Sequence, residues 1–122
     1  FKIFTDARIC LISDSMEAAG LPDGRYSLGG QVVFVQHQRA TLPDGTLAGS
    51  VASLADCVHN AIQWGIPPET AFAAATMMPA RILGIAHQTG SIAPGKQADL
   101  LVLDQTFRMQ RVLLRGRWLD TI

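Results

Sequence analysis

The sequence predicts an α/β fold, and three observations support this prediction. Residues 9–12 (Ile-Cys-Leu-Ile) form a short apolar run, which is typical of a strand buried on both faces in a parallel sheet. From residue 51 the apolar side chains recur at positions 51, 54, 55, 58, 61 and 62, which is the spacing of one helix face. From Gly90 onward the pattern changes to short strand-like runs separated by turns.

Length and composition exclude several classes of protein. The 122 residues are enough for one ordinary domain with a modest core. Lys+Arg and Asp+Glu balance at 10 each, so no basic surface indicates binding to nucleic acid or to an anionic membrane. No apolar run reaches the roughly 18 residues of a membrane-spanning helix. Cys10 and Cys57 are predicted to be small buried hydrophobic residues, and we expect a cytoplasmic protein in a reducing compartment.

Asp14 is the first candidate for chemistry. It follows the predicted strand at 9–12 almost directly, with Ser13 between them. In α/β folds, ligands bind and catalytic side chains project at the carboxyl ends of the strands. An Asp at such a point also commonly caps a turn or a helix start. Spacing alone leaves both interpretations open.

A hairpin-like excursion is predicted from about Tyr26 to Leu47. Residues 31–36 (Gln-Val-Val-Phe-Val-Gln) are rich in β-formers, and Pro-Asp-Gly at 43–45 is a turn signal. Gly49 then permits close approach of the backbone to a ligand, and Ser50 is a suitable N-cap for the next helix. A hinge followed by a helix cap explains the same residues equally well. Both interpretations, a ligand-binding segment and a hinge with a cap, therefore stay open.

Two helices are predicted in the middle of the chain. The first ends at Trp64-Gly65, where glycine suits the position after a helix. The second opens at Pro67-Pro68 and continues to Met78, where Pro79 is expected to break it. A short helical turn then closes at Gly84.

The last part of the chain predicts strands and tight turns. Pro94 and Gly95 occupy the two central positions of a type II turn. A buried strand is predicted at 97–104 and a further strand at about 107–114, with a tight turn at Arg115-Gly116. Lys96 lacks the glycine-rich spacing of a phosphate-binding loop and is predicted to be a surface turn lysine.

Three separated motifs resemble the amidohydrolases, most closely the N-acetylglucosamine-6-phosphate deacetylase family. Residues 13–26, followed by Gly29, are similar to that family's TDAMAAAGLPDGRY–LGG pattern, with Ser13 where the family usually has Thr. Residues 46–50 read TLAGS, and residues 90–104 read GSIAPGKQADLLVLD, a typical amidohydrolase tail. Their joint occurrence in this order is far more specific than any one of them.

The resemblance implies a more detailed fold class. It identifies the chain as the C-terminal portion of a metal-dependent-hydrolase (β/α)₈ TIM barrel plus strands of a small β-sandwich domain. Residues 1–86 would be the last part of the barrel, and residues 87–122 the C-terminal strands of a composite β-sandwich that also takes strands from the amino-terminal end of the enzyme. Because such a barrel has about 250 residues, we expect a C-terminal fragment whose partner is the missing N-terminal part of the barrel.

The same resemblance implies an activity and the residues that serve it. The enzymes of the family remove the acetyl group from N-acetylglucosamine 6-phosphate, a small sugar phosphate, and release glucosamine 6-phosphate and acetate. By resemblance, Asp14 is the catalytic general acid/base, and the backbone of Leu47, Ala48 and Gly49 binds the substrate. Many of these enzymes are dimers, so a homodimer is a further expectation.

The resemblance also implies a divalent metal, with zinc as the first choice. In the family a Glu and two His from earlier barrel strands hold this metal, and these positions do not exist in this chain. His37, His59 and His87 stand alone in the sequence, without a His-x-His or His-Glu-x-x-His pattern. We therefore assign no metal ligand to this chain and expect it to be inactive by itself.

Two alternatives remain open. One is an N-acetylgalactosamine-6-phosphate deacetylase, because the contacts that distinguish the two sugars are not represented in this chain. The other is a non-catalytic stand-alone module. A single barrel strand without neighbours would expose a sheet edge and much apolar surface, which argues against such a module.

Overall fold

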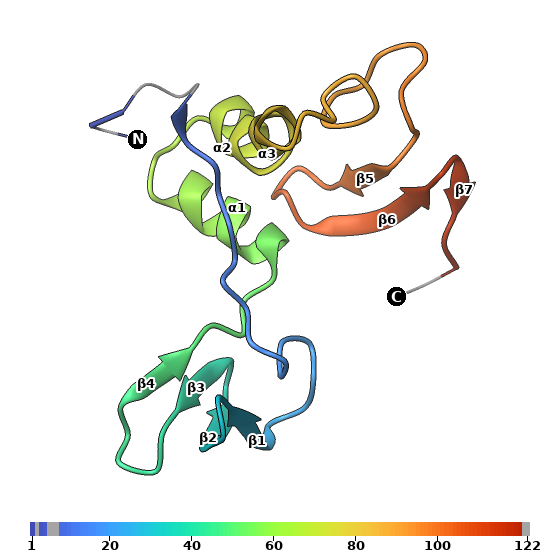
Figure 1. Cartoon of the computed structure of the whole chain (residues 1–122). Coiled ribbons are helices and arrows are strands. Elements are labelled where there is room, and N and C mark those ends of the chain that lie inside the picture. The colour runs from blue at the N-terminus through green and yellow to red at the C-terminus, as the bar shows by residue number, and fades with distance from the viewer. Residues whose placement is uncertain (2, 5–7, 121–122) are drawn as a thin grey trace. The chain divides into compact units, whose positions relative to one another are not determined.

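The structure is a computed structural model that describes residues 1, 3–4 and 8–120, and the chain divides into two compact units (Figure 1). One unit comprises residues 12–57, and the other comprises residues 1–11 and 58–122. Each has its own cluster of buried apolar side chains. The sequence predicts a different kind of boundary, at residue 86, between the barrel and the sandwich. The division into two compact units does not test that boundary, which stays a prediction.

The unit of residues 12–57 contains a four-stranded antiparallel meander. Its strands are β1 (Gly24–Leu28), β2 (Gln31–Gln36), β3 (Arg39–Thr41) and β4 (Leu47–Gly49), in the spatial order β1-β2-β3-β4 (Figure 1). Two-residue turns join the first three strands, and all four turn residues (Gly29, Gly30, His37 and Gln38) have positive φ, as the twist of tight hairpins requires. The predicted excursion is confirmed, and the structure extends it to residues 24–49.

The core of this unit lies on one face of the meander. Val33 and Val35 of β2 are buried, whereas Phe34 between them is 39% exposed, as the two-residue period of a strand requires. Ala40 of β3 lies in the same cluster, together with Met16 and Ala18 from the loop before β1. The loop that follows Asp14 is therefore part of the core of this unit.

The strand predicted at residues 9–12 is wrong for this structure. No strand is assigned at these positions, which are among the described residues. A buried parallel strand needs a neighbour on each edge, and here the backbone N–H of Leu11 donates to the carbonyl of Ala74 in a helix, 2.9 Å away. Ile12 is 67% exposed. The apolar run is present without the sheet that would bury it.

Helix α1 (Leu54–Gln63) has its N-cap three residues later than predicted. Ser53 is the observed cap, because its hydroxyl oxygen accepts the backbone N–H of Asp56 at 3.1 Å. The Asp56 carboxylate in turn accepts the backbone N–H of Ser53 at 3.0 Å, which completes a capping box. The N-cap prediction for Ser50 is wrong, because the backbone of Ser50 pairs with Ser15.

The next two helices are α2 (Pro68–Ala75) and α3 (Met77–Ile82). The break between them lies at Thr76, with φ −128° and ψ −76°, and not at Pro79 as predicted. Pro79 falls in the first turn of α3, where a helix does not need the N–H that proline lacks. The predicted glycine caps at Gly65 and Gly84 are confirmed: each has positive φ and bonds back into its helix.

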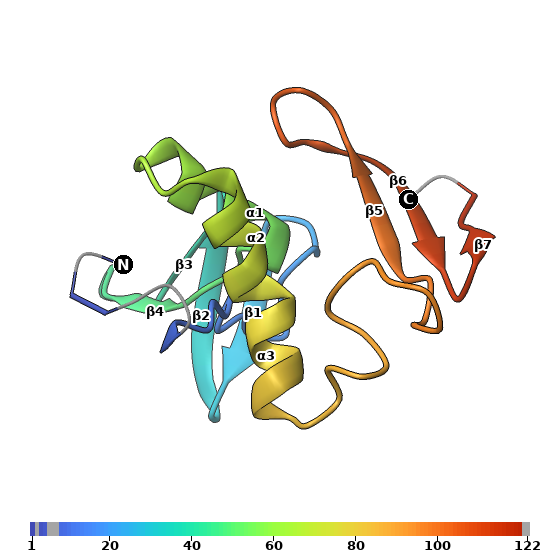
Figure 2. The same cartoon turned by 90° about the horizontal axis from the view of Figure 1, so that it is seen from above.

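The C-terminal strands form an antiparallel sheet of β5 (Leu100–Leu103), β6 (Met109–Leu114) and β7 (Arg117–Trp118). Figure 2 shows β6 between the other two strands. The type II turn is confirmed, since the N–H of Lys96 donates to the carbonyl of Ala93. The prediction that the first strand is buried is wrong, because Leu101 is 52% exposed and Val102 is 41% exposed. A sheet of three strands has too little neighbouring structure to bury both of its faces.

None of the helices in the described part of the chain has the length and apolar character needed to cross a membrane.

Candidate functional site

Asp14 lies in the loop between the apolar run and the meander, with its side chain exposed. Its φ is +51°, in the left-handed region that most L-residues avoid. Aspartate tolerates this conformation better than most residues because its short polar side chain can form local hydrogen bonds. The exposed carboxylate is thus available to solvent and to a bound molecule.

The loop of Asp14 is joined to the end of β4. Ser15 and Ser50 form an isolated parallel β-bridge. The backbone N–H of Met16 donates to the carbonyl of Ser50 at 2.8 Å, and the hydroxyl of Ser15 donates to the carbonyl of Ala52. Asp14 and Gly49 each come one residue before a partner of this bridge. The structure therefore brings together two segments that the sequence analysis singled out separately, and both lie within one unit.

Leu47, Ala48 and Gly49 are the three residues of β4. Leu47 is 66% exposed, whereas Ala48 packs against the core of the unit. A Cβ added to Gly49 would lie 3.5 Å from the nearest Leu28 side-chain atom and 3.7 Å from Met16 Sδ, which are ordinary van der Waals contacts. The fold itself therefore does not demand glycine at position 49. The substrate-binding role of the three residues stays a prediction.

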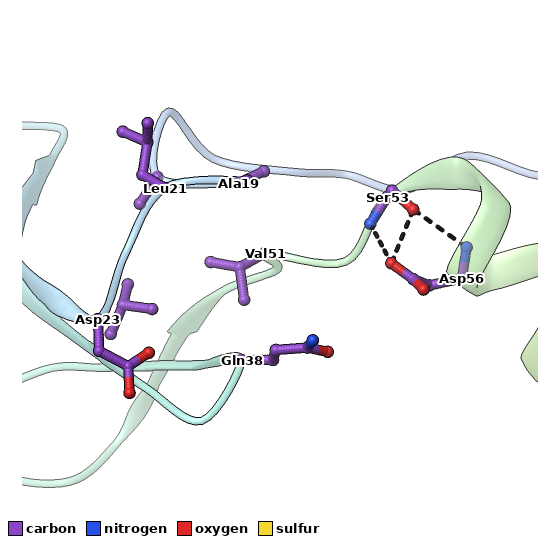
Figure 3. Close-up of a pocket in the computed structure, with 10 residues that line it drawn as sticks. Ala19, Leu21, Asp23, Gln38, Val51, Ser53 and Asp56 are labelled. Carbon is purple, nitrogen blue, oxygen red and sulfur yellow. Dashed lines mark hydrogen bonds between the residues drawn. The ribbon is translucent and has the colours of Figure 1, made fainter. Parts of the chain in front are cut away.

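A pocket of about 400 Å³ lies in the same unit (Figure 3). It is lined by Ala18, Ala19, Gly20, Leu21, Asp23, Val35, Gln38, Val51, Ser53 and Asp56. Three of its polar side chains already have partners: Asp23 accepts the backbone N–H of His37 at 3.0 Å, and Ser53 and Asp56 bond to each other in the capping box drawn in Figure 3. Neither Asp14 nor β4 lines this pocket. It is accordingly not the place where the candidate residues meet.

The histidines do not form a metal centre. His37 is an exposed turn residue, and His87 is exposed with its Nε2 3.0 Å from the side-chain amide of Gln88. His59 is half-buried, with its Nε2 3.4 Å from Arg108 and its Nδ1 buried without a partner. Among the described residues there is no group of three or more His, Cys, Asp or Glu that could hold a metal ion. The donors that this part of the chain supplies do not fit the metal implied by the resemblance.

Both cysteines are free thiols, and both are half-buried, so the prediction that they are buried is wrong. Cys57 is half-buried, and its burial raises the pKa of the thiol, with a smaller contribution from the neighbouring Asp56 carboxylate. A raised pKa keeps the group in its unreactive protonated form. Cys57 is therefore a packing residue.

Lys96 has a role that the sequence analysis missed. It is half-buried, and its Nζ donates to the Ser91 hydroxyl at 2.7 Å and to the carbonyls of Ala86 and Thr89. These bonds tie together the segment between α3 and β5. The predicted turn position of Lys96 is confirmed, but the predicted surface location is wrong, because its ammonium donors bond to backbone and hydroxyl oxygens of this segment. No sequence signal marks these acceptors, which become close only when the segment folds back.

Comparison with known proteins places these features in a family. The model of the amidohydrolase family matches residues 10–119. Two Escherichia coli proteins, from strains K12 and O157:H7, are each 40% identical over 111 residues, or 90% of this chain. The second is named N-acetylgalactosamine-6-phosphate deacetylase. A Vibrio furnissii N-acetylglucosamine-6-phosphate deacetylase is 38% identical over 112 residues, or 91% of this chain.

Comparison with solved structures also finds a deacetylase. The N-acetylglucosamine-6-phosphate deacetylase of Pasteurella multocida matches 94% of this chain with a TM-score of 0.86 and 28% identity, and this chain covers 31% of it. This chain spans 66% of the K12 relative, 29% of the O157:H7 relative and 28% of the V. furnissii relative. It thus corresponds to less than a third of the length of most of these proteins.

Proposed function

The chain belongs to the amidohydrolase family, and from this premise we propose that it forms part of an enzyme that deacetylates N-acetylglucosamine 6-phosphate. The products are glucosamine 6-phosphate and acetate. The observation that carries this proposal is the bridge between Ser15 and Ser50, which puts the Asp14 loop beside β4. The resemblance assigns two parts of the active site to this chain, namely Asp14 and the sugar-binding segment at residues 47–49. The bridge makes these two segments neighbours.

The Asp14 carboxylate is suited to move a proton in this reaction. Hydrolysis of the acetamido group joins a water oxygen to the carbonyl carbon and breaks the bond from that carbon to nitrogen. A carboxylate within hydrogen-bond reach takes a proton from the water and passes one to the departing amine nitrogen. Asp14 is exposed, so its carboxylate is accessible to water and to a substrate. It is the group of this chain that we assign to the proton transfer.

A divalent metal, with zinc as our first choice, would polarise the carbonyl and the water when bound. The described residues do not supply its ligands. We therefore assign no step of the reaction to a metal held by this chain, and we propose that the 122-residue chain alone does not turn over substrate.

We further propose that residues 1–86 complete a (β/α)₈ barrel and that residues 87–122 contribute to a β-sandwich in the assembled enzyme. The TM-score of 0.86 to a deacetylase more than three times as long supports this arrangement. In such an assembly the apolar run at 9–12 gains strand neighbours, and the exposed Leu101 and Val102 gain a cover. Their exposure in the present structure supports the same proposal.

N-acetylgalactosamine 6-phosphate is the second candidate substrate. The deacetylase named for this sugar is 40% identical to this chain and the V. furnissii enzyme is 38% identical, so sequence identity does not separate the two sugars. The two sugars differ in the configuration of one hydroxyl group. Only a direct comparison of turnover separates them.

The test is acetate release by the native preparation, by which we mean the chain purified from its own cells with every polypeptide and metal that stays bound. Native mass spectrometry and a metal assay on the same sample establish its composition. We expect the native preparation to release acetate from N-acetylglucosamine 6-phosphate and, more slowly, from N-acetylgalactosamine 6-phosphate. We expect the isolated 122-residue chain to release no acetate from either sugar phosphate. If the native preparation releases acetate from neither sugar phosphate, the proposed function is wrong.

A further inference from the structure

On the C-terminal side of Asp14, the loop is bonded to residues 50–52, and further along Glu17 accepts the backbone N–H of Ser27 at 3.4 Å. The Met16 N–H donates to the Ser50 carbonyl at 2.8 Å, and the Ser15 hydroxyl donates to the Ala52 carbonyl at 2.5 Å. The Ala52 N–H donates to the Ser50 hydroxyl oxygen at 3.2 Å. The backbone of Ala52 is thus held from both sides, by the hydroxyl groups of Ser15 and Ser50.

The backbone of Asp14 needs such support. Its φ of +51° lies in the left-handed region that most L-residues avoid. A residue in this region returns to an extended conformation when its neighbours release it. Such a change at position 14 would move the carboxylate relative to β4. The bonds made by the two following residues, together with the burial of Met16, therefore help to hold the backbone of Asp14 in this conformation.

From this geometry we infer that Ser15 is a positioning residue for Asp14, acting through its hydroxyl bond to Ala52; the inference rests on the function proposed above. The Met16 bond is made by backbone and persists with any side chain. The bond from the Ser15 hydroxyl is the side-chain contribution to the attachment of the loop to residues 50–52. Its proton is committed to the Ala52 carbonyl, so the hydroxyl supports the loop and does not itself react with substrate.

The first test follows the Met16 amide by hydrogen exchange in the full 122-residue chain. Ser15→Ala removes the hydroxyl, and we expect Met16 exchange about fivefold faster, as for the loss of one ordinary hydrogen bond. Ser15→Thr retains a hydroxyl, and we expect a rate close to that of the native chain. Ser27→Ala changes an exposed serine of β1 in the same unit and should have no effect. Equal Met16 rates in native chain and Ser15→Ala, or an unprotected Met16 amide in the native chain, would overturn the inference.

The second test measures turnover in the native preparation. A misplaced carboxylate slows the chemical step and leaves substrate binding intact, so we expect Ser15→Ala to lower kcat about tenfold with KM within about twofold. Ser15→Thr should restore most of kcat. Loss of fold would also lower the apparent kcat at unchanged KM, so kcat is expressed per folded protein, with the folded fraction of each variant measured on the same sample.

The two proposals fail in different ways. If the native preparation is inactive, the proposed function is wrong, and the exchange rate of Met16 still decides whether Ser15 holds the loop. If the native preparation is active but Ser15→Ala has native kcat, the deacetylase function stands and the positioning role is wrong.

Discussion

Two irregular segments of this chain are fastened in different ways. The loop around Asp14 makes a few bonds to residues 50–52 and leaves its carboxylate in solvent. The segment between α3 and β5, residues 83–99, is packed closely at Gly90 and tied by the half-buried Lys96. A segment that places a reactive group needs that group exposed, whereas a segment that joins two elements gains from filling its interior. The same residue type should therefore respond differently to substitution in the two segments.

The largest effect on stability is expected for Gly90→Ala. Gly90 has φ +89°, and an added Cβ would lie 2.7 Å from the Ala80 Cβ and 3.1 Å from the Thr76 carbonyl oxygen. Backbone strain and overpacking together should cost about 3 kcal/mol of unfolding free energy. Urea denaturation of the chain measures this. Gly84→Ala is the matched control: it has φ +72° and no atom within 4 Å of the added Cβ, so it should cost only the strain, about 1 kcal/mol. Equal costs for the two variants would show that the close packing at Gly90 is absent.

A smaller loss of stability is expected for Lys96→Met. The variant keeps much of the side-chain volume but removes the three donors, leaving the half-buried Ala86 carbonyl without its partner. The expected cost is about 1–2 kcal/mol, measured by the same denaturation. Arg25→Met, an exposed cation of β1, should be close to neutral. An unchanged midpoint for Lys96→Met would mean that water satisfies these oxygens equally well.

Gly49→Ala should change substrate binding and leave stability within about 0.5 kcal/mol. The fold accepts a Cβ here at ordinary contact distances. If the sugar approaches the backbone of β4, the same methyl group lies in its way, and KM for the sugar phosphate in the native preparation should rise about tenfold. An unaltered KM would show that the sugar does not bind against β4. A large loss of stability would contradict the ordinary contact distances found for a Cβ at position 49.

The smallest effect is the pH dependence contributed by Asp104. The backbone N–H of Arg108, followed by Thr106, lowers the pKa of this exposed carboxyl group below its ordinary value of 3.8. Because the folded-state pKa is depressed, the stabilisation is present above the unfolded value and is lost as pH falls through the folded value. Native chain and Asp104→Asn should therefore differ in melting temperature at pH 6 and converge at about pH 2. A difference that does not shrink on acidification would contradict this role.

The sequence predicts the local turns and the glycine C-caps well, because these depend on a few neighbouring residues, whereas the N-cap predicted at Ser50 is wrong because Ser50 pairs with the distant Ser15. Gly65 and Gly84 end helices, Pro94-Gly95 makes a turn, and the β-rich run at 31–36 becomes β2. The short range of these interactions means that no distant part of the chain is needed to decide them.

Longer-range features escape such prediction. The run at 9–12 has the composition of a buried strand, but a strand also requires neighbours to pair with. Lys96 donates hydrogen bonds to three oxygen atoms that lie close to it only in the folded segment. Likewise the candidate residues Asp14 and 47–49 were predicted one by one, and only the bridge from Ser15 to Ser50 shows that they are neighbours.

The most direct test of the account is the turnover of Asp14→Asn in the native preparation. Asparagine adopts positive φ readily, so the loop should keep its conformation while the proton-transfer group is lost. Asp23→Asn, an exposed carboxylate of the same unit, is the control. We predict that Asp14→Asn lowers kcat at least about a hundredfold and that Asp23→Asn stays within about twofold. Turnover by Asp14→Asn at the native rate would contradict the assignment of Asp14 as the proton-transfer group.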